Sequence, residues 1–343
     1  MTQRIDAQPD GREFESLTGP FRRELLAHCY RLLGSVDDAE DLVQETYLRA
    51  WRSFDRFEGR SSLRTWLYQI ATNACLTALR HSSRRQLPSG LGGPGDDPGL
   101  RRGGGASGEI SWLQPMPDTL VAPASGDPAA IAISRESLRL ALIASLQYLP
   151  PRQRAVLLLR DVLAFPAADV AGMLDTTTAA VKSALQRARA RLEHIAPTPD
   201  QVTEPAEPDA RALLDQYIAA FENADAAALQ RLLRADATLE LPPSAAWYTG
   251  SDAAATAVTG LGSPGEWRMV PATANGQPAA ATYRRGHDGV YRAYGVVVLT
   301  ASSAGSAGIA GSIGIARITV FADPGLLATF GLPPVHLDPI PAR

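Results

Sequence analysis

The pattern of apolar and polar positions between residues 35 and 80 predicts two amphipathic helices joined by a short loop. The first begins after Ser35, an N-cap residue with Asp38 three positions on. The second begins after Ser61 or Ser62. Apolar residues recur at the three- and four-residue steps of one buried helical face. They are Val43, Tyr47, Ala50 and Phe54 in the first helix, and Leu63, Leu67, Ile70 and Ala74 in the second.

The same periodicity predicts helices over residues 13–34 and 135–195. In the later stretch a short helix over 166–174, a tight turn and a basic helix over 179–194 follow the helix-turn-helix plan. The basic helix has the inward positions Val181, Leu185, Ala188 and Leu192. The earlier stretch ends at Gly34, and its inner face holds Phe14, Leu17, Phe21, Leu25, Cys29 and Leu32.

Beyond residue 205 the pattern changes from helices to strands. Helices are predicted over 209–223, 226–233 and 252–258, and strands over 237–241, 267–274, 279–285, 290–301 and 309–321. Asn275-Gly276 is a strong signal for a hairpin turn. Helices followed by a meander of strands indicate an α+β domain with a curved sheet wrapped on its helices.

Glycine and proline dominate residues 86–134, where they fill 17 of 49 positions. This composition predicts a flexible tether with no core of its own. One apolar island, residues 110–118 with the sequence ISWLQPMPD, interrupts it. Because Trp112 and Leu113 are apolar, we expect the island to be held against a neighbouring domain, with the two side chains as interdomain contacts.

Length and composition are those of a multidomain globular protein: 343 residues, 45% hydrophobic and 20% charged. The polar N-terminus is not a signal peptide, and no apolar run approaches the roughly 20 residues that span a bilayer. We therefore expect a cytoplasmic protein without a membrane partner. Cys29 and Cys75 are the only cysteines, so we expect buried, inert thiols rather than a disulfide framework. No metal-ligand spacing occurs, and no cofactor is expected.

Charge is distributed unevenly, although the net charge is only −3. Residues 135–196 carry nine Lys or Arg against five Asp or Glu, whereas residues 201–343 carry nine against thirteen. A basic module therefore precedes an acidic one. Lys182 is the only lysine, and the other cationic side chains are arginines, which suit bidentate phosphate or base contacts.

Polar and aromatic residues lie off the apolar stripe of the helix that follows Ser62, among them Arg64, Trp66 and Tyr68. An exposed mixture of arginine and aromatic side chains suits single-stranded nucleic acid, because bases stack and the backbone is negative. A purely structural explanation remains open. Acidic residues near the start of a helix and arginine near its end interact favourably with the helix dipole and need no further role. In that case Trp66 and Tyr68 would be core residues on a wider apolar stripe.

The ordered string DDAEDLVQETYLRAW, followed by FEGRSSLRTWLYQIATNACLTALR, closely resembles region 2 of the sigma-70 family in its small extracytoplasmic-function branch. In that family the acidic helix docks on the clamp helices of RNA polymerase, and the Trp-containing helix with its preceding loop captures the promoter's −10 element. The resemblance implies polymerase contacts at Asp38, Asp41, Gln44 and Glu45. It implies −10 contacts at Arg60, Arg64, Trp66, Tyr68, Gln69, Asn73 and Arg80.

The string LPPRQRAVLLLRDVLAFPAADVAGMLDTTTAAVKSALQRARARL resembles region 4 of the same family. In that family the last helix of this region enters the major groove at the −35 element. The resemblance implies −35 contacts at Thr178, Lys182, Ser183, Gln186, Arg187 and Arg189. A flexible tether occupies the place of region 3, as expected for this branch.

The C-terminal segment resembles the SnoaL-like domains, which are cone-shaped α+β folds, in its element order and in fragments such as ATANGQPAAATYRR. The resemblance implies a pocket that could hold a small ligand. The aromatic residues placed near it are equally explained by core packing, and they are Tyr217, Trp247, Tyr248, Trp267, Tyr283 and Tyr291. His287-Asp288 is the only candidate acid–base pair and looks more like a hairpin turn, so no catalytic site is expected.

The sequence therefore predicts two all-α domains, the second a helix-turn-helix, followed by a cone-shaped α+β domain. The expected boundaries are 13–85 for region 2, 86–134 for the linker, 135–196 for region 4 and 205–343 for the SnoaL-like domain. The expected function is that of a sigma factor whose partners are core RNA polymerase and promoter DNA, with the fused domain modulating its activity in cis. Two alternatives stay open, namely a ligand sensor or enzyme targeted to DNA by sigma-like modules, and a helix-turn-helix repressor.

Overall fold

The computed structural model describes residues 11–59, 61–95, 110–122, 136–195, 207–302 and 313–336, and divides into two compact units. The first contains Met1–Arg85 and Leu120–Ala196, and the second contains Gln86–Thr119 and Pro197–Arg343. Most of the linker that separates the two helical domains in the sequence thus belongs to the same unit as the C-terminal domain.

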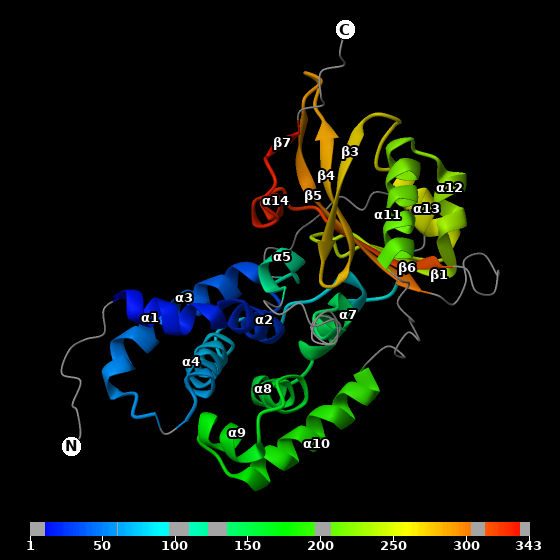
Figure 1. Cartoon of the computed structure of the whole chain (residues 1–343). Coiled ribbons are helices and arrows are strands. Elements are labelled where there is room, and N and C mark those ends of the chain that lie inside the picture. Colours follow the sequence, from blue (N-terminus) through cyan, green and yellow to red (C-terminus); the bar gives the residue numbers. More distant parts are fainter. Residues whose placement is uncertain are drawn as a thin grey trace. The chain divides into compact units, whose positions relative to one another are not determined.

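Helices build the first unit (Figure 1). Residues 11–85 form the N-terminal module and residues 136–195 the helix-turn-helix module. The helices are α1 (Gly11–Thr18), α2 (Arg22–Leu33), α3 (Val36–Ser53), α4 (Leu63–Ala78), α7 (Leu140–Leu146), α8 (Pro151–Leu157), α9 (Ala167–Met173) and α10 (Thr178–Ile195). Short 3-10 turns occupy Gly19–Phe21 and Phe54–Arg56, and a π turn occupies Leu158–Val162. Helix α5 (Asp118–Val121) is a single turn that begins at the last residue of the island, and only its second half belongs to the first unit.

Serine caps begin the two long helices of the N-terminal module, as predicted. The Ser35 hydroxyl accepts a hydrogen bond from the Asp38 backbone N–H, and the Ser62 hydroxyl accepts one from the Thr65 N–H. Each bond satisfies a donor that the first turn of a helix leaves free. Gly34 closes α2 with a φ of 72°, which a residue without Cβ adopts at little cost.

The core of the N-terminal module follows most of the predicted stripe. Val43, Ala50, Leu67 and Ala74 are buried, as are Phe14, Leu25, Cys29 and Leu32. The expectation for Leu17 is wrong, since this side chain is 44% exposed. Helix α1 ends at Thr18 and a 3-10 turn follows, so the helical period assumed through residues 13–34 breaks there.

The helix-turn-helix is confirmed in its element order and close to its predicted bounds. Helix α9 is followed by a turn in which Asp175 has a φ of 48° and the Thr176 N–H donates to the Ala171 carbonyl. On α10, Val181 and Ala188 face the core, and Leu185 and Leu192 are half-buried. The opposite face of α10 is left for contacts outside the module.

The second unit combines helices with one mixed sheet. Its helices are α11 (Glu207–Glu222), α12 (Ala226–Leu232), α13 (Ser251–Thr259) and α14 (Leu326–Thr329), and a 3-10 turn lies at Pro88–Gly90. Its strands are β1 (Leu233–Glu240), β2 (Trp247–Thr249), β3 (Trp267–Ala274), β4 (Gln277–Arg285), β5 (Tyr291–Ser302), β6 (Gly314–Phe321) and β7 (Val335–His336).

Within the described residues the sheet has the strand order β2-β1-β6-β5-β4-β3, with β7 paired to β5. The pair β1–β6 is parallel and the other pairs are antiparallel. Asn275 and Gly276 have φ values of 57° and 67°, so they form the predicted turn between β3 and β4. Helices α11, α12 and α13 lie on one face of the sheet (Figure 1).

Some elements escaped the sequence analysis. The strands β2 and β7 have three and two residues, and α14 has four, which is too short for a periodic signal. The expected strand over 309–321 is described from Gly314, and residues 309–312 lie outside the described part of the chain.

Candidate nucleic-acid and polymerase interfaces

An acidic edge runs along the solvent side of α3. Asp41 and Gln44 are exposed, whereas Asp38 and Glu45 are partly covered. The Asp38 carboxylate accepts a hydrogen bond from Arg85 at 2.6 Å, and Glu45 pairs with Arg49 at 2.7 Å. These four residues recur at helical spacing, so their side chains share one face.

An exposed leucine continues this acidic edge by one turn. Leu48 lies four positions after Gln44 and is 50% exposed, and it is the most exposed of three large apolar side chains that lie at the surface among the described residues. Leu48 was not among the residues predicted to contact a partner, although its spacing of seven and four residues from Asp41 and Gln44 places it on the same helical face. An apolar side chain beside acids resembles the composition of a protein-binding surface.

Trp66 sits at the edge of the N-terminal module and is half-buried. Its ring lies 4.9 Å from the ring of Phe57 and 6.2 Å from that of Phe54. One side of the indole therefore packs on the loop before α4. Gln69 is half-buried, Arg80 is exposed, and Arg60 lies outside the described residues.

The prediction that Tyr68 is exposed is wrong, because its side chain is fully buried. Its hydroxyl donates to Glu24 at 3.2 Å, and its ring lies 5.2 Å from that of Phe165 in the helix-turn-helix module. Burial raises the pKa of the Tyr68 phenol, so the group stays neutral. The stripe on α4 is wider than predicted because a second module, distant in the sequence, covers its flank.

Arg64 is engaged in the same cluster. Its guanidinium lies 4.9 Å from the centre of the Tyr68 ring and 4.8 Å from that of Phe165, and it pairs with Glu24 at 3.0 Å. Nine residues further along α4, the Asn73 side-chain amide donates to the Met173 carbonyl at 3.1 Å. Three of the side chains expected at the −10 element thus contact the other module or lie beneath it.

Two buried arginines join the same modules elsewhere. Arg31 on α2 donates to the Ser137 hydroxyl at 2.7 Å and to the Ser137 carbonyl at 3.2 Å. Arg154 on α8 donates to the Leu32 carbonyl at the end of α2 and to acceptors on Gln147 and Leu149. Neither arginine was predicted to have a role, because nothing in the local sequence marks a side chain whose partner lies 106 or 122 positions away.

The predicted −35 residues share the outer face of α10. All six are exposed, namely Thr178, Lys182, Ser183, Gln186, Arg187 and Arg189. Arg187 donates to Ser183 at 2.6 Å, and Arg189 forms a two-bond pair with Asp161 at 2.7 and 2.9 Å. The face therefore offers cations and amides to a ligand, with Arg189 restrained by its acidic neighbour.

The island packs into the second unit. Leu113 and Met116 are buried, and Trp112 is half-buried. The Asn275 side-chain oxygen accepts from the Met116 N–H at 2.9 Å, while the Asn275 N–H donates to the Met116 carbonyl at 2.8 Å. The Asp118 carboxylate accepts from the Gly276 N–H at 2.8 Å. The turn between β3 and β4 therefore binds the island through both of its residues.

The earlier part of the linker is held by β1 and β2. Glu240, whose side chain is fully buried, accepts from the Ser89 N–H at 3.1 Å. The Trp247 indole donates to the Gly92 carbonyl, and the Trp247 carbonyl accepts from the Gly95 N–H. The expectation of a flexible tether is wrong for residues 86–95, because a domain outside the linker supplies the core that its own composition lacks. The island at residues 110–118 is held against the C-terminal domain, as expected.

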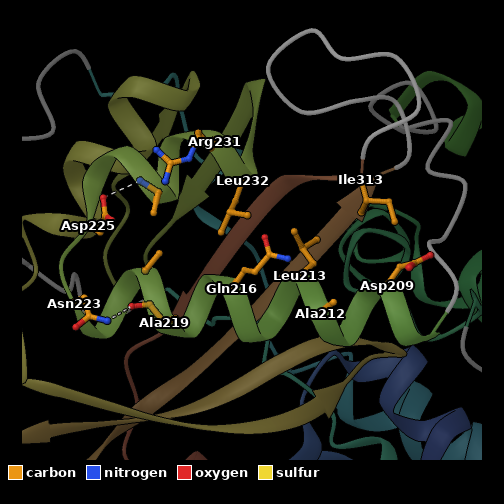
Figure 2. A pocket seen from close by; sticks show the side chains of 12 residues that line it. Asp209, Ala212, Leu213, Gln216, Ala219, Asn223, Asp225, Arg231, Leu232 and Ile313 are labelled. Atoms are coloured by element: carbon orange, nitrogen blue, oxygen red, sulfur yellow. Dashed lines mark hydrogen bonds between the residues drawn. The ribbon is translucent and has the colours of Figure 1, made fainter.

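The tail, residues 207–336, holds a pocket of about 720 Å³ between α11 and α12, with Gln216 and Leu213 on one side and Arg231 and Leu232 on the other (Figure 2). The aromatic residues named as candidates do not line it. Tyr217, Tyr248, Trp267, Tyr283 and Tyr291 are buried and Trp247 binds the linker, so core packing and linker contact explain them.

His287-Asp288 belongs to a turn, as expected. The Asp288 carboxylate accepts from the Val290 N–H at 3.2 Å and pairs with Arg292 at 2.6 Å, and Gly289 has a φ of 80°. Within the part of the chain that the structure describes, no cluster of three metal-binding side chains occurs, and no helix has the length and hydropathy to cross a bilayer.

Comparison with known proteins gives two matches to domain families. Sigma-70 region 2 matches residues 17–85, and Sigma-70, region 4 matches residues 139–192. These spans fall inside the two helical modules.

Two relatives in Mycobacterium tuberculosis cover most of the chain. The chain is 48% identical over 329 residues to ECF RNA polymerase sigma factor SigG, and the matched residues cover 94% of this chain and 84% of that relative. It is 30% identical over 256 residues to ECF RNA polymerase sigma factor SigJ, covering 73% of this chain and 72% of that relative. Superposition on the crystal structure of SigJ gives a TM-score of 0.55 at 24% sequence identity and covers 95% of this chain and all of that one. The two proteins therefore have a similar fold.

Proposed function

The chain belongs to the extracytoplasmic-function (ECF) branch of the sigma-70 family of RNA polymerase sigma factors, and we propose that it recognises −10 and −35 promoter elements with its two helical modules. It is a transcription initiation factor and not an enzyme, and sigma factors bind core RNA polymerase and promoter DNA. The observation that carries the proposal is the outer face of α10, where all six predicted −35 residues are exposed.

In this proposal the acidic edge of α3 docks on the polymerase. Asp41 and Gln44 are exposed, and Leu48 adds an apolar contact on the same face. A repressor of the helix-turn-helix class has no need of such a surface. The acidic edge therefore favours the sigma-factor hypothesis over the repressor alternative.

Promoter binding in this proposal needs both modules at once. A handful of phosphate contacts on α10 gives weak, salt-sensitive affinity by itself. Core polymerase holds both modules on one duplex and so raises their effective concentration. Trp66 then stacks on the opened strand, where stacking contributes about 1–3 kcal/mol per base.

Run-off transcription with core polymerase tests the proposal. We expect promoter-dependent transcripts from the wild-type chain, and loss of polymerase binding in the double charge reversal Asp41→Arg/Glu45→Arg, because it turns an attraction into a repulsion. The matched control is Asp209→Arg/Asp215→Arg, which reverses two exposed acids on α11. Transcripts absent with the wild-type chain, or binding unchanged by the α3 reversal, would contradict the assignment.

The proposal extends to the tail, a SnoaL-like domain that modulates the sigma modules in cis. Its support is the capture of the linker by the turn at Asn275 and by Glu240 and Trp247. Because the linker connects the two DNA modules, a domain that holds the linker can control their separation. A small ligand that bound the pocket between α11 and α12 would change how the tail controls the separation of the modules. In this proposal the protein acts in the cytoplasm, together with RNA polymerase.

Deleting residues 205–343 tests the role of the tail. We expect transcriptional output from the tail-less chain to differ from that of the full chain, and Trp112→Ala/Leu113→Ala to shift output in the same direction. The control is Leu91→Ala, an exposed leucine of the same linker. Equal output from the full chain, the tail-less chain and the island variant would remove the tail from the mechanism.

A further inference from the structure

We propose that the pocket between α11 and α12 binds a small molecule with one carboxylate on an apolar body, and that the bound molecule acts on the strands that hold the linker. The regulatory part of this inference rests on the proposed function of the tail. The binding part rests on the geometry of the tail alone. Figure 2 shows the pocket, with α11 along one side and α12 along the other.

Small side chains on the two helices create the pocket. Helix α11 lines it with Ala212 and Ala219, and α12 lines it with Ala228. Packed helices normally interlock larger side chains and leave few voids larger than a water molecule. Here about 720 Å³ stays open, a volume typical of small-molecule sites. The buried rings of Tyr217 and Trp267 belong to the core of the domain and do not line this space.

Two polar side chains of the pocket have unused hydrogen-bonding capacity. Gln216 on α11 and Arg231 on α12 are exposed and lie on opposite sides of the pocket (Figure 2). Neither has a hydrogen-bond or ion-pair partner within the described part of the chain. By contrast, the Asn223 amide donates to a carbonyl of its own helix, and the Asp225 carboxylate caps α12. A guanidinium and an amide are therefore available to a ligand.

The charges around the pocket determine the class of ligand. The Arg231 guanidinium can hold a carboxylate through two parallel N–H···O bonds, while Leu232 and Ile313 offer an apolar surface to the rest of the molecule. Asp209 and Asp225 add two negative charges to the same lining, and they disfavour a second anionic group on the ligand. We therefore expect a medium-chain monocarboxylate such as decanoate to bind more tightly than a dicarboxylate of the same length.

The lining of the pocket continues into the two strands that hold the linker. Leu232 is the last residue of α12 and β1 begins at the next residue, while Ile313 directly precedes β6. The parallel pairing of β1 with β6 is irregular at this end, so the two strands can shift there without breaking a regular ladder. The other end of β1 carries Glu240, which accepts from the Ser89 N–H of the linker. A molecule lodged between α11 and α12 therefore acts on the strand that binds the linker.

Calorimetric titration of the full chain with decanoate tests the binding part. We expect saturable binding at one site, and Arg231→Gln should weaken it about tenfold because one charge-assisted pair of hydrogen bonds is lost. The control Arg211→Gln removes an exposed arginine of α11 that does not line the pocket, and it should bind decanoate as the wild-type chain does. Absence of saturable binding, or equal weakening in the two variants, would overturn the proposal.

A second variant pair and two further probes test the place and the charge of the ligand. Ala219→Leu fills the pocket and should abolish decanoate binding, whereas Ala227→Leu adds the same bulk at an exposed position of α12 outside the pocket. Decanedioate and decyltrimethylammonium should both bind more weakly than decanoate, because the first adds a carboxylate and the second replaces it with a cation. Binding unchanged in Ala219→Leu with helical content retained, or preference for the cation, contradicts the assignment.

Amide hydrogen exchange tests the action on the linker. Saturating decanoate should change the exchange of residues 86–95 in the wild-type chain and leave it unchanged in Ala219→Leu, and unaltered exchange in the ligand-bound wild-type chain would remove the regulatory part. Failure of this inference and failure of the proposed function are distinguishable. Promoter-dependent transcripts from a chain that does not bind decanoate contradict this inference and leave the function standing. Decanoate binding by a chain that yields no transcripts contradicts the function and leaves the site in place.

Discussion

His28 shows at the scale of one residue how burial controls ionisation in this chain. Its ring is fully buried, with Nε2 at 2.9 Å from the Thr72 hydroxyl. Burial lowers the pKa of His28 to about 3, and the nearby Arg31 and Arg64 charges act in the same direction. Burial also raises the pKa of the Cys75 thiol, and the neighbouring Cys29 thiol acts in the same direction. These groups are therefore neutral at neutral pH, which suits packing rather than chemistry.

The depressed pKa of His28 predicts a loss of stability in acid. The unfolded chain takes up a proton near pH 6.5, whereas the folded chain does so only near pH 3, so the free energy of unfolding falls as pH drops between these values. We expect this group to remove about 2 kcal/mol between pH 7 and pH 5. Urea unfolding at the two pH values measures the change.

Two substitutions isolate the contribution of His28. His28→Gln removes the ionisable ring, so its stability should depend less steeply on pH even if the variant is less stable throughout. His81→Gln changes an exposed histidine and serves as the control. If His28→Gln kept the full pH dependence of the wild-type chain, the buried neutral histidine would not be its source.

At the scale of an element, the β3–β4 hairpin combines a local turn with recognition of a distant segment. Asn275 adopts a positive φ that the turn requires, and the same residue bonds both backbone groups of Met116. Strand β3 is the last strand in the sheet order, and the island meets it at Pro117 and Ala274. An unpaired strand edge is a ready template for another segment, and here the linker covers part of it.

Removing the Asn275 side chain should loosen the island. Asn275→Gly keeps the positive φ accessible but deletes the oxygen that accepts from the Met116 N–H. We expect amide hydrogen exchange over residues 112–118 to rise about tenfold, since one hydrogen bond contributes on the order of 1 kcal/mol. Asn275→Asp retains an acceptor and should keep the protection. Equal exchange in both variants would show that the side-chain bond does not hold the island.

The outer face of α10 predicts a specific response to salt. Lys182 is exposed, whereas Arg189 is paired with Asp161. If Lys182 contacts a phosphate, Lys182→Ala should reduce the slope of log affinity against log salt by about 1. Asp161→Asn frees Arg189 and should make the slope steeper. Holoenzyme binding to a promoter duplex at several salt concentrations measures both.

The control for this series lies in the tail. Arg211→Ala removes one exposed positive charge from α11, so it changes the net charge as Lys182→Ala does. A slope that falls equally in Arg211→Ala and Lys182→Ala would mean that net charge, and not contact by α10, controls binding.

At the scale of the whole molecule, local periodicity was sufficient to predict those elements whose structure depends on residues close to them in the sequence. The caps at Ser35 and Ser62, the helix-turn-helix and the hairpin at Asn275 all depend on neighbours within a few residues. The errors arose where a distant segment decides the environment. Tyr68 is buried by Phe165, nearly 100 positions away, and the glycine-rich linker is ordered by β1, β2 and the β3–β4 turn.

The pairing of the two linker segments has a consequence for promoter choice. The Gln86 N–H donates to the Ser111 carbonyl, and the Leu113 N–H donates to the Gln86 carbonyl. This bridge takes residues 87–110 out of the path between the modules, which is roughly 80 Å of extended chain. The path from Ser111 to residue 139, where the region 4 match begins, then extends to no more than about 90–100 Å. A bridged linker would thus be nearly taut on a promoter of ordinary spacing, and it would discriminate against start sites whose spacer is longer by a few base pairs.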